Sequence, residues 1–210
     1  MTSVPLEPTV RAPQHAGPPI RVVDDKRGTW GMALLITTEA MLFVMLFFTY
    51  YYVEKGNERW KYTEPPKLHY SLPMLGVLLT SSIVLHWGEK QVKKQRYSSG
   101  RVGVIGTIVL GFVFLFLSYL EYTEHLATLS PRSDAYGSIF YTIISVHLAH
   151  LTLGLLMLFW VLFVARRWEP AQHTPHRPYH NAAMYWHFVD TVWVFIIALL
   201  YVAPNIYNRL

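Results

Sequence analysis

Five long apolar segments constrain this 210-residue chain more than any other feature of its sequence. They run approximately over residues 30–53, 71–87, 102–122, 137–164 and 183–203. A helix of about 20 residues crosses a hydrocarbon core about 30 Å thick, and each segment is near or above that length. In lipid, a single segment satisfies its backbone hydrogen bonds only as a helix. The sequence therefore predicts an all-α fold, an integral membrane bundle of five transmembrane helices.

The composition excludes several classes of protein. Charged residues make up 15% of the chain and hydrophobic residues 52%, whereas an average soluble domain is roughly 25% charged. Cysteine is absent, so thiolate metal sites and disulfides are excluded. The net charge of +5 lies in loops between apolar segments rather than in a basic patch with interleaved aromatic residues. We therefore expect no nucleic-acid partner.

The distribution of Lys and Arg predicts the orientation of the chain. The N-terminal tail and the second and fourth loops carry twelve of these residues, and the opposite side carries six. Because cytoplasmic loops are enriched in Lys and Arg, this places the N-terminus in the cytoplasm, or the matrix, and the C-terminus outside. Residues 1–29, with five prolines, are predicted to form a polar cytoplasmic tail, and residues 30–210 to form the membrane domain.

Small residues recur in the third segment at a spacing that favours close helix packing. Gly103, Thr107 and Gly111 are four residues apart, so they lie on one side of a helix. Small residues at this spacing let two helix backbones approach. A chance recurrence accounts for the pattern equally well.

Ionisable residues lie within the predicted helices, where each carries an insertion penalty of about 2.5–3.5 kcal/mol. The protonatable or buried polar candidates are Glu39, Glu121, Glu124, His147, His150, His187 and Asp190. The two histidines of the fourth segment are three residues apart, as are the histidine and aspartate of the fifth, so each pair shares one face of its helix. The two glutamates of the third segment lie near its outer end, where we expect water to reach them.

Several roles are compatible with these residues. The side chains can hydrogen-bond one another inside the bundle, line a proton route or hold a cofactor. Burial favours the neutral form of Glu39, which suits a protonatable role. There is no HExxH motif and no duplicated Glu-x-x-His pattern of a di-iron bundle, so we assign no metal ligand. His150 and His187 remain candidate ligands of a haem held between two helices.

Four motifs resemble, in order, those of the cytochrome c oxidase subunit III family. They are W-G-M at residues 30–32 followed by Glu39, E-Y-T-E at 121–124, Y-G-S at 136–138 followed by His147, His150 and Gly154, and Y-W-H-F-V-D at 185–190. The first is similar to the opening of the third helix of the seven-helix form. The others are similar to the acidic motif before an outer loop, to the sixth helix and to the seventh. Together they cover most of the chain from Trp30 onward.

The resemblance implies an accessory subunit of a proton-pumping terminal oxidase, a cytochrome c or quinol oxidase that reduces O2 to water. It implies direct packing against subunit I, with subunit II and other respiratory subunits nearby. It also implies that haem and copper belong to partner subunits, that this chain holds no cofactor, metal or catalytic residue, and that membrane phospholipid is a candidate ligand. Glu39 matches the family's buried carboxylate in this helix. His147, His150, His187 and Asp190 match its polar bundle positions.

The chain departs from the seven-helix pattern because it lacks the two N-terminal helices. In the longer form these helices help to make a lipid-holding cleft, which here would need helices from another chain. Short five-helix forms are bacterial, so we predict a bacterial plasma membrane, with the mitochondrial inner membrane as the alternative. Three other functions stay open: an independent ion or proton transporter, a haem-binding membrane protein, and an accessory protein of nitric oxide reductases.

Overall fold

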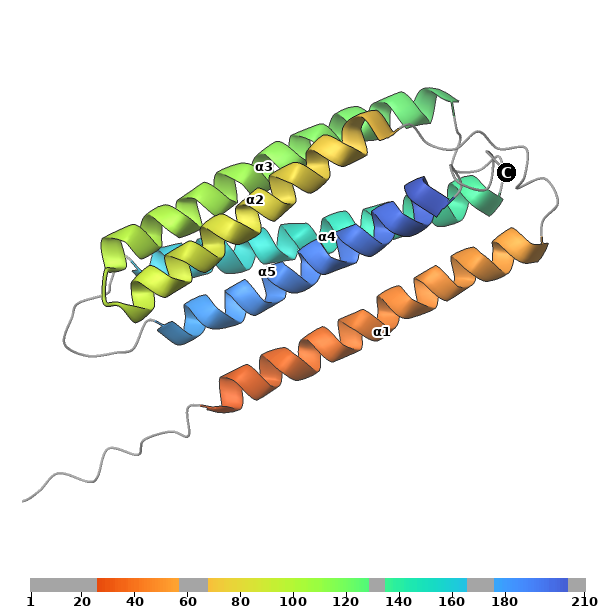
Figure 1. Ribbon diagram of the computed structural model, residues 1–210. Helices are drawn as coiled ribbons and strands as arrows, with labels where there is room; N and C mark the ends of the chain where they lie inside the picture. Colours follow the sequence, from red (N-terminus) through yellow and green to blue (C-terminus); the bar gives the residue numbers. More distant parts are fainter. Residues whose placement is uncertain (1–25, 57–67, 129–134, 166–175, 204–210) are drawn as a thin grey trace, which may run out of the picture.

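The computed structural model describes residues 26–56, 68–128, 135–165 and 176–203, and these ranges form five long helices (Figure 1). The helices are α1 (Lys26–Gly56), α2 (Leu68–Lys93), α3 (Tyr97–Thr128), α4 (Ala135–Ala165) and α5 (His176–Ile196). A short π-helical segment, η2 (Ile197–Val202), continues α5. The described ranges contain no strand, and all five helices are long and apolar enough to cross a membrane. The predicted all-α fold class and number of spanning helices are therefore confirmed.

The helices extend beyond the apolar segments that predicted them. The second segment was expected over residues 71–87, but α2 continues to Lys93. Its last turns are polar, and Glu89 forms an ion pair with Lys93, four residues later, with 2.9 Å between Oε1 and Nζ. Such pairs stabilise a helix outside the hydrocarbon. Hydrophobicity thus marks the part of a helix that lies in lipid, and not the point where the helix ends.

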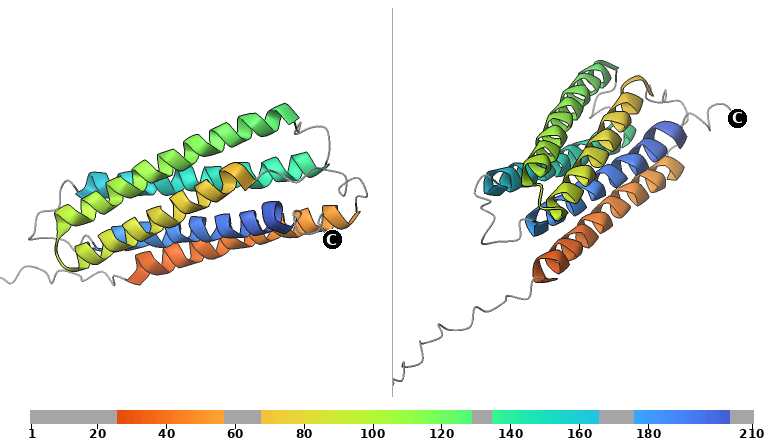
Figure 2. Two further views of the ribbon diagram at one scale, coloured as in Figure 1. Left: turned by 45° about the horizontal axis from the view of Figure 1, so that its top comes forward. Right: turned by 60° about the vertical axis from the view of Figure 1, so that its left-hand side comes forward.

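A tight turn joins α2 to α3. Gln95 has a φ of 60°, and its N–H donates to the Val92 carbonyl at 2.9 Å. The Arg96 N–H donates to the Gln91 carbonyl at 2.9 Å. This is the Schellman pattern that ends a helix with one left-handed residue, here a glutamine instead of the usual glycine. The turn reverses the chain within three residues, so α2 and α3 pack side by side along most of their length (Figures 1 and 2).

Two glycines of the predicted small-residue pattern, Gly103 and Gly111, lie where α3 packs closely against other helices. A Cβ added to Gly103 would lie 2.8 Å from the Cα of Gly88 on α2. A Cβ added to Gly111 would lie 2.7 Å from a methyl carbon of Leu155 on α4 and 3.0 Å from the ring of Trp186 on α5. Glycine at these two positions therefore lets α3 approach three neighbouring helices.

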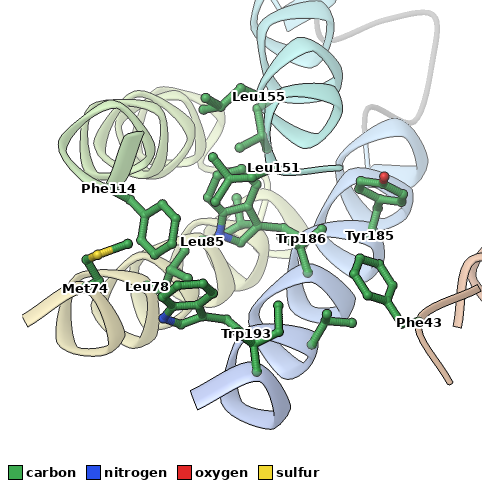
Figure 3. Close-up of a cluster of buried hydrophobic side chains, with 14 of the residues drawn as sticks. Phe43, Met74, Leu78, Leu85, Phe114, Leu151, Leu155, Tyr185, Trp186 and Trp193 are labelled. Carbon is green, nitrogen blue, oxygen red and sulfur yellow. The ribbon is translucent and has the colours of Figure 1, made fainter. Parts of the chain in front are cut away.

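The core of the bundle is built around α5, which contacts α1, α2 and α4. Trp186 and Trp193 are fully buried and point from α5 toward Leu78 of α2 and Phe114 of α3 (Figure 3). By contrast, α1 lies along one side of the bundle against α4 and α5 (Figures 1 and 2), and Phe43 is among its few buried side chains. The polar residues of α1 thus face either α4 and α5 or the outside of this chain.

Candidate functional site

A carboxylate–histidine pair joins α1 to α4 near the middle of both helices. Glu39 Oε2 lies 2.8 Å from His150 Nε2. The other ring nitrogen, His150 Nδ1, lies 2.7 Å from the Val146 carbonyl oxygen. A carbonyl can only accept a hydrogen bond, so Nδ1 carries a proton.

This geometry fixes the number of protons on the pair. Nε2 either donates to a carboxylate from an imidazolium, or accepts from a neutral Glu39 carboxyl. In both cases the two side chains together are neutral, which avoids a net charge in lipid. The Glu39 side chain is 28% exposed and the His150 side chain 13% exposed, so the pair is open at one edge to whatever surrounds this chain.

His147 lies one turn from His150 but has a different environment. It is fully buried and stacks on Trp193, with ring centroids 5.0 Å apart and an interplanar angle of 25°. Phe114 meets it edge-on at 6.1 Å. Neither of its ring nitrogens hydrogen-bonds to any residue in the described ranges. The shared helix face predicted for the two histidines therefore gives only His150 a carboxylate partner.

His187 and Asp190 are connected through a serine of α2. Ser82 Oγ lies 2.7 Å from His187 Nδ1 and also contacts Asp190 Oδ2 at hydrogen-bonding range. The next serine, Ser81, accepts a hydrogen bond of 2.9 Å from Trp186 Nε1. Two adjacent serines of α2 thus fix the position of α5 along α2.

A second polar cluster lies at the end of α2 that is close to the α2–α3 turn. Glu89 is buried, and its Oε1 lies 2.9 Å from both Lys93 Nζ and His180 Nδ1. Its Oε2 lies 3.9 Å from His86 Nδ1. This cluster was not among the predicted site residues, because the apolar segment that predicted α2 stops at residue 87. The signal was present in the spacing of Ser82, His86 and Glu89, which repeats every three to four residues and so marks one helix face.

The Glu121 side chain is buried and hydrogen-bonded to other helices, and is not exposed to water. We expected water to reach it, but it is buried, and its Oε1 accepts hydrogen bonds from Ser71 Oγ at 2.9 Å and Tyr201 Oη at 3.0 Å. These contacts tie α3 to α2 and η2. The other predicted residue of this motif, Glu124, has a side chain outside the described part of the structure.

With this geometry established, comparison with known proteins identifies the family. The family model described as cytochrome c oxidase subunit III matches residues 20–204. The chain belongs to the cytochrome c oxidase subunit III family. The match covers all five helices and every predicted site residue.

Individual members of the family show how far the similarity extends. Cytochrome c oxidase subunit 3 of Artemia franciscana is 30% identical over 178 residues, which cover 82% of this chain and 67% of that protein. The same subunit of Thermostichus vulcanus is 28% identical over 190 residues, or 90% of each chain. That of Synechocystis sp. is 29% identical over 189 residues, or 89% of this chain and 77% of the relative. The predicted family and the predicted function as an accessory subunit of a haem–copper oxidase are therefore confirmed.

For this subunit III, the geometry disfavours the haem hypothesis raised by its sequence. Both ring nitrogens of His150 have partners, the Val146 carbonyl and Glu39, which leaves no nitrogen for iron. Within the described ranges, His187 uses only Nδ1, in its contact with Ser82, but a bis-histidine haem site would still lack His150 as its second ligand. Across the residues that the structure describes, no three His, Asp or Glu side chains are grouped to hold a metal ion.

Proposed function

We propose that this subunit III is a non-catalytic, membrane-embedded component that packs directly against the haem- and copper-bearing subunit I, stabilises it and supports its uptake of protons. Subunit II and other respiratory subunits complete the complex, and the haem and copper belong to the partners. One observation carries the protonic part of this proposal, namely the neutral Glu39–His150 pair, which holds a transferable proton near the membrane centre and is open at one edge.

The pair can serve proton uptake because the proton between the two side chains can be bound by either of them. Moving it between Glu39 Oε2 and His150 Nε2 changes no net charge, and it requires no rearrangement of the helices. A carboxylate that is 28% exposed at this depth is expected to face protein or a water-filled space rather than acyl chains. Glu39, rather than the fully enclosed His147, is therefore the residue that a partner subunit can reach.

The proposed location is a bacterial plasma membrane with the N-terminus in the cytoplasm. The start of α1, the α2–α3 turn and the start of α5 lie at the same end of the bundle (Figure 1). Lys90, Lys93, Lys94 and Arg96 are at that end too. This concentration of cations supports a cytoplasmic position.

A cavity of about 390 Å³ at the same end has the chemistry of a phospholipid site. Its polar lining includes Arg27, Arg177 and Asn181, and its apolar lining includes Met32 and Met157. Guanidinium groups bind phosphate oxygens, and the methionines suit an acyl chain. The cavity is large enough for a headgroup and the beginning of a chain, so we assign it to membrane phospholipid.

The test replaces Glu39 in the assembled oxidase. Glu39→Gln keeps the size of the side chain and removes its acidic proton. We expect unchanged co-purification with subunit I and unchanged haem content, but slower proton uptake or a shorter turnover lifetime. Glu54→Gln, near the other end of α1, is the matched control and should behave as the wild type.

Two results would count against the proposal. Wild-type proton uptake and lifetime in Glu39→Gln would remove the protonic role. Native material purified in mild detergent that contains no haem–copper subunit would remove the accessory role altogether.

A further inference from the structure

Polar residues of α2 and α5 face one another along the contact between the two helices. We call this set the polar seam, and it comprises Ser82, His86, Glu89, His180, His187 and Asp190. The α2 members are spaced four and three residues apart, and the α5 members seven and three, so each group occupies one helix face. The seam is separate from the Glu39–His150 pair, which joins α1 to α4.

The end of the seam nearest the α2–α3 turn combines a buried carboxylate with an exposed imidazole. Glu89 holds contacts of 2.9 Å with both Lys93 and His180. His86, whose Nδ1 is 3.9 Å from Glu89 Oε2, has a side chain that is 54% exposed. His86, exposed on this chain and near the end of α2, is therefore the imidazole at which the seam would take up a proton from water.

The middle of the seam consists of two histidine rings. His86 and His187 lie with ring centroids 6.4 Å apart in an edge arrangement. The two rings are too far apart for a direct hydrogen bond, so the relay requires a bridging water between a nitrogen of each ring. Each imidazole can accept a proton on one nitrogen and release another from the opposite nitrogen.

At the other end of the seam, His187, Ser82 and Asp190 form a hydrogen-bonded chain along which a proton can be transferred. Ser82 Oγ is 2.7 Å from His187 Nδ1 and also contacts Asp190 Oδ2. A hydroxyl has one proton, so it can donate to only one of these neighbours at a time. Either His187 donates to Ser82 and Ser82 donates to Asp190, or both bonds run in the opposite direction.

Asp190 ends the chain deep in the membrane. It is the fifteenth residue of α5, which places it about 21 Å from the start of that helix at 1.5 Å per residue. Its Oδ2 contacts Ser82, and its Oδ1 is buried without a hydrogen bond to any described residue. Oδ2 is thus used by the seam, and Oδ1 is enclosed within the bundle at membrane depth.

We propose that the polar seam is a proton relay that carries protons between the exposed end of α2 and the Asp190 carboxylate near the membrane centre. This inference rests on the proposed function, because the partner subunit I of the oxidase would consume the protons that the relay delivers. In one transfer His187 gains a proton on Nε2 and gives its Nδ1 proton to Ser82 Oγ. Ser82 in turn gives its hydroxyl proton to Asp190 Oδ2. The reverse steps restore the starting state, and no electron is transferred.

The test uses the two adjacent serines as a matched pair in the intact oxidase complex. Infrared spectroscopy follows hydrogen–deuterium exchange of the Asp190 carboxyl after transfer to D2O, and the band is assigned by its loss in Asp190→Asn. Ser82→Ala removes the relay hydroxyl, and we expect it to slow the exchange by about tenfold or more. Ser81→Ala loses the bond from Trp186 and the Ser81 Oγ bond to the Leu78 carbonyl, but no contact of the polar seam. This variant and Ser82→Thr, which keeps a hydroxyl, should exchange like the wild type.

Several outcomes would overturn the relay. These are equal exchange rates in Ser82→Ala and the wild type, equal slowing in Ser81→Ala, or the absence of an Asp190 carboxyl band at every pH at which the complex is stable. If Asp190→Asn fails to assemble, Asp190→Glu assigns the band by its frequency shift. Haem content and co-purification are measured on the same samples. Intact assembly with unaltered exchange refutes the relay alone, whereas loss of the oxidase partner from wild-type material refutes the proposed function.

Discussion

The crossing of α2 and α3 leaves no room for a side chain at Gly103, where an added Cβ would meet the backbone of the other helix. A Cβ at Gly103 would lie 2.8 Å from the Cα of Gly88, 3.3 Å from its backbone nitrogen and 3.2 Å from the Tyr179 hydroxyl. Non-bonded carbons rest at about 3.5–4.0 Å, so Gly103→Ala requires the helices to separate by close to 1 Å. Because the nearest atom belongs to the backbone, a rotamer change cannot relieve the clash.

We expect Gly103→Ala to destabilise the chain by about 1–3 kcal/mol, the usual range for overpacking. The matched control is Gly76→Ala on α2, where an added Cβ would meet nothing within 4 Å. Alanine is the better helix former, so the control should be neutral or stabilising by up to about 1 kcal/mol. The measurement is the denaturant midpoint of the purified chain in detergent, followed by helical circular dichroism. Equal midpoints for the two variants would refute the close approach of α2 and α3.

Two further predictions concern the ends of the bundle. A Cβ at Gly88 would lie 2.2 Å from the Tyr179 hydroxyl, so Gly88→Ala should destabilise the chain. In a double-mutant cycle, Tyr179→Phe removes that hydroxyl and should recover about 1 kcal/mol of the lost stability. Strictly additive effects of the two substitutions would contradict this prediction. Tyr201→Phe removes a 3.0 Å hydrogen bond to the buried carboxylate of Glu121, and we expect a cost of about 1–3 kcal/mol. Tyr119→Phe, an exposed tyrosine of the same bundle, serves as its control and should change the thermal midpoint little.

The sequence predicts which polar residues share a helix face, but it does not predict which residues of other helices they contact. Spacing alone placed His187 and Asp190 on one face of a helix, and the structure agrees. It did not identify Ser82, because serine occurs often in apolar helices and its hydroxyl usually bonds to its own backbone. Spacing also placed His147 and His150 on one helix face, although only His150 meets a carboxylate.

Other differences follow from burial. Glu121 was expected to be wet because it lies near a helix end, but η2 places Tyr201 over it. Position along one helix gives the depth of a residue in the membrane. It does not say which neighbouring element covers that residue.

The sequence by itself determined that this chain forms five membrane-spanning helices and which polar residues those helices carry into the membrane. It could do so because backbone hydrogen bonds in lipid are made within one segment, so that length and hydrophobicity suffice. The tertiary structure decided which of those residues meet. Glu39 and His150 are 111 residues apart, and Ser82 and His187 are 105 residues apart. Their contacts depend on the relative rotation and vertical offset of separate helices, which side-chain packing across the whole bundle fixes and no local pattern records.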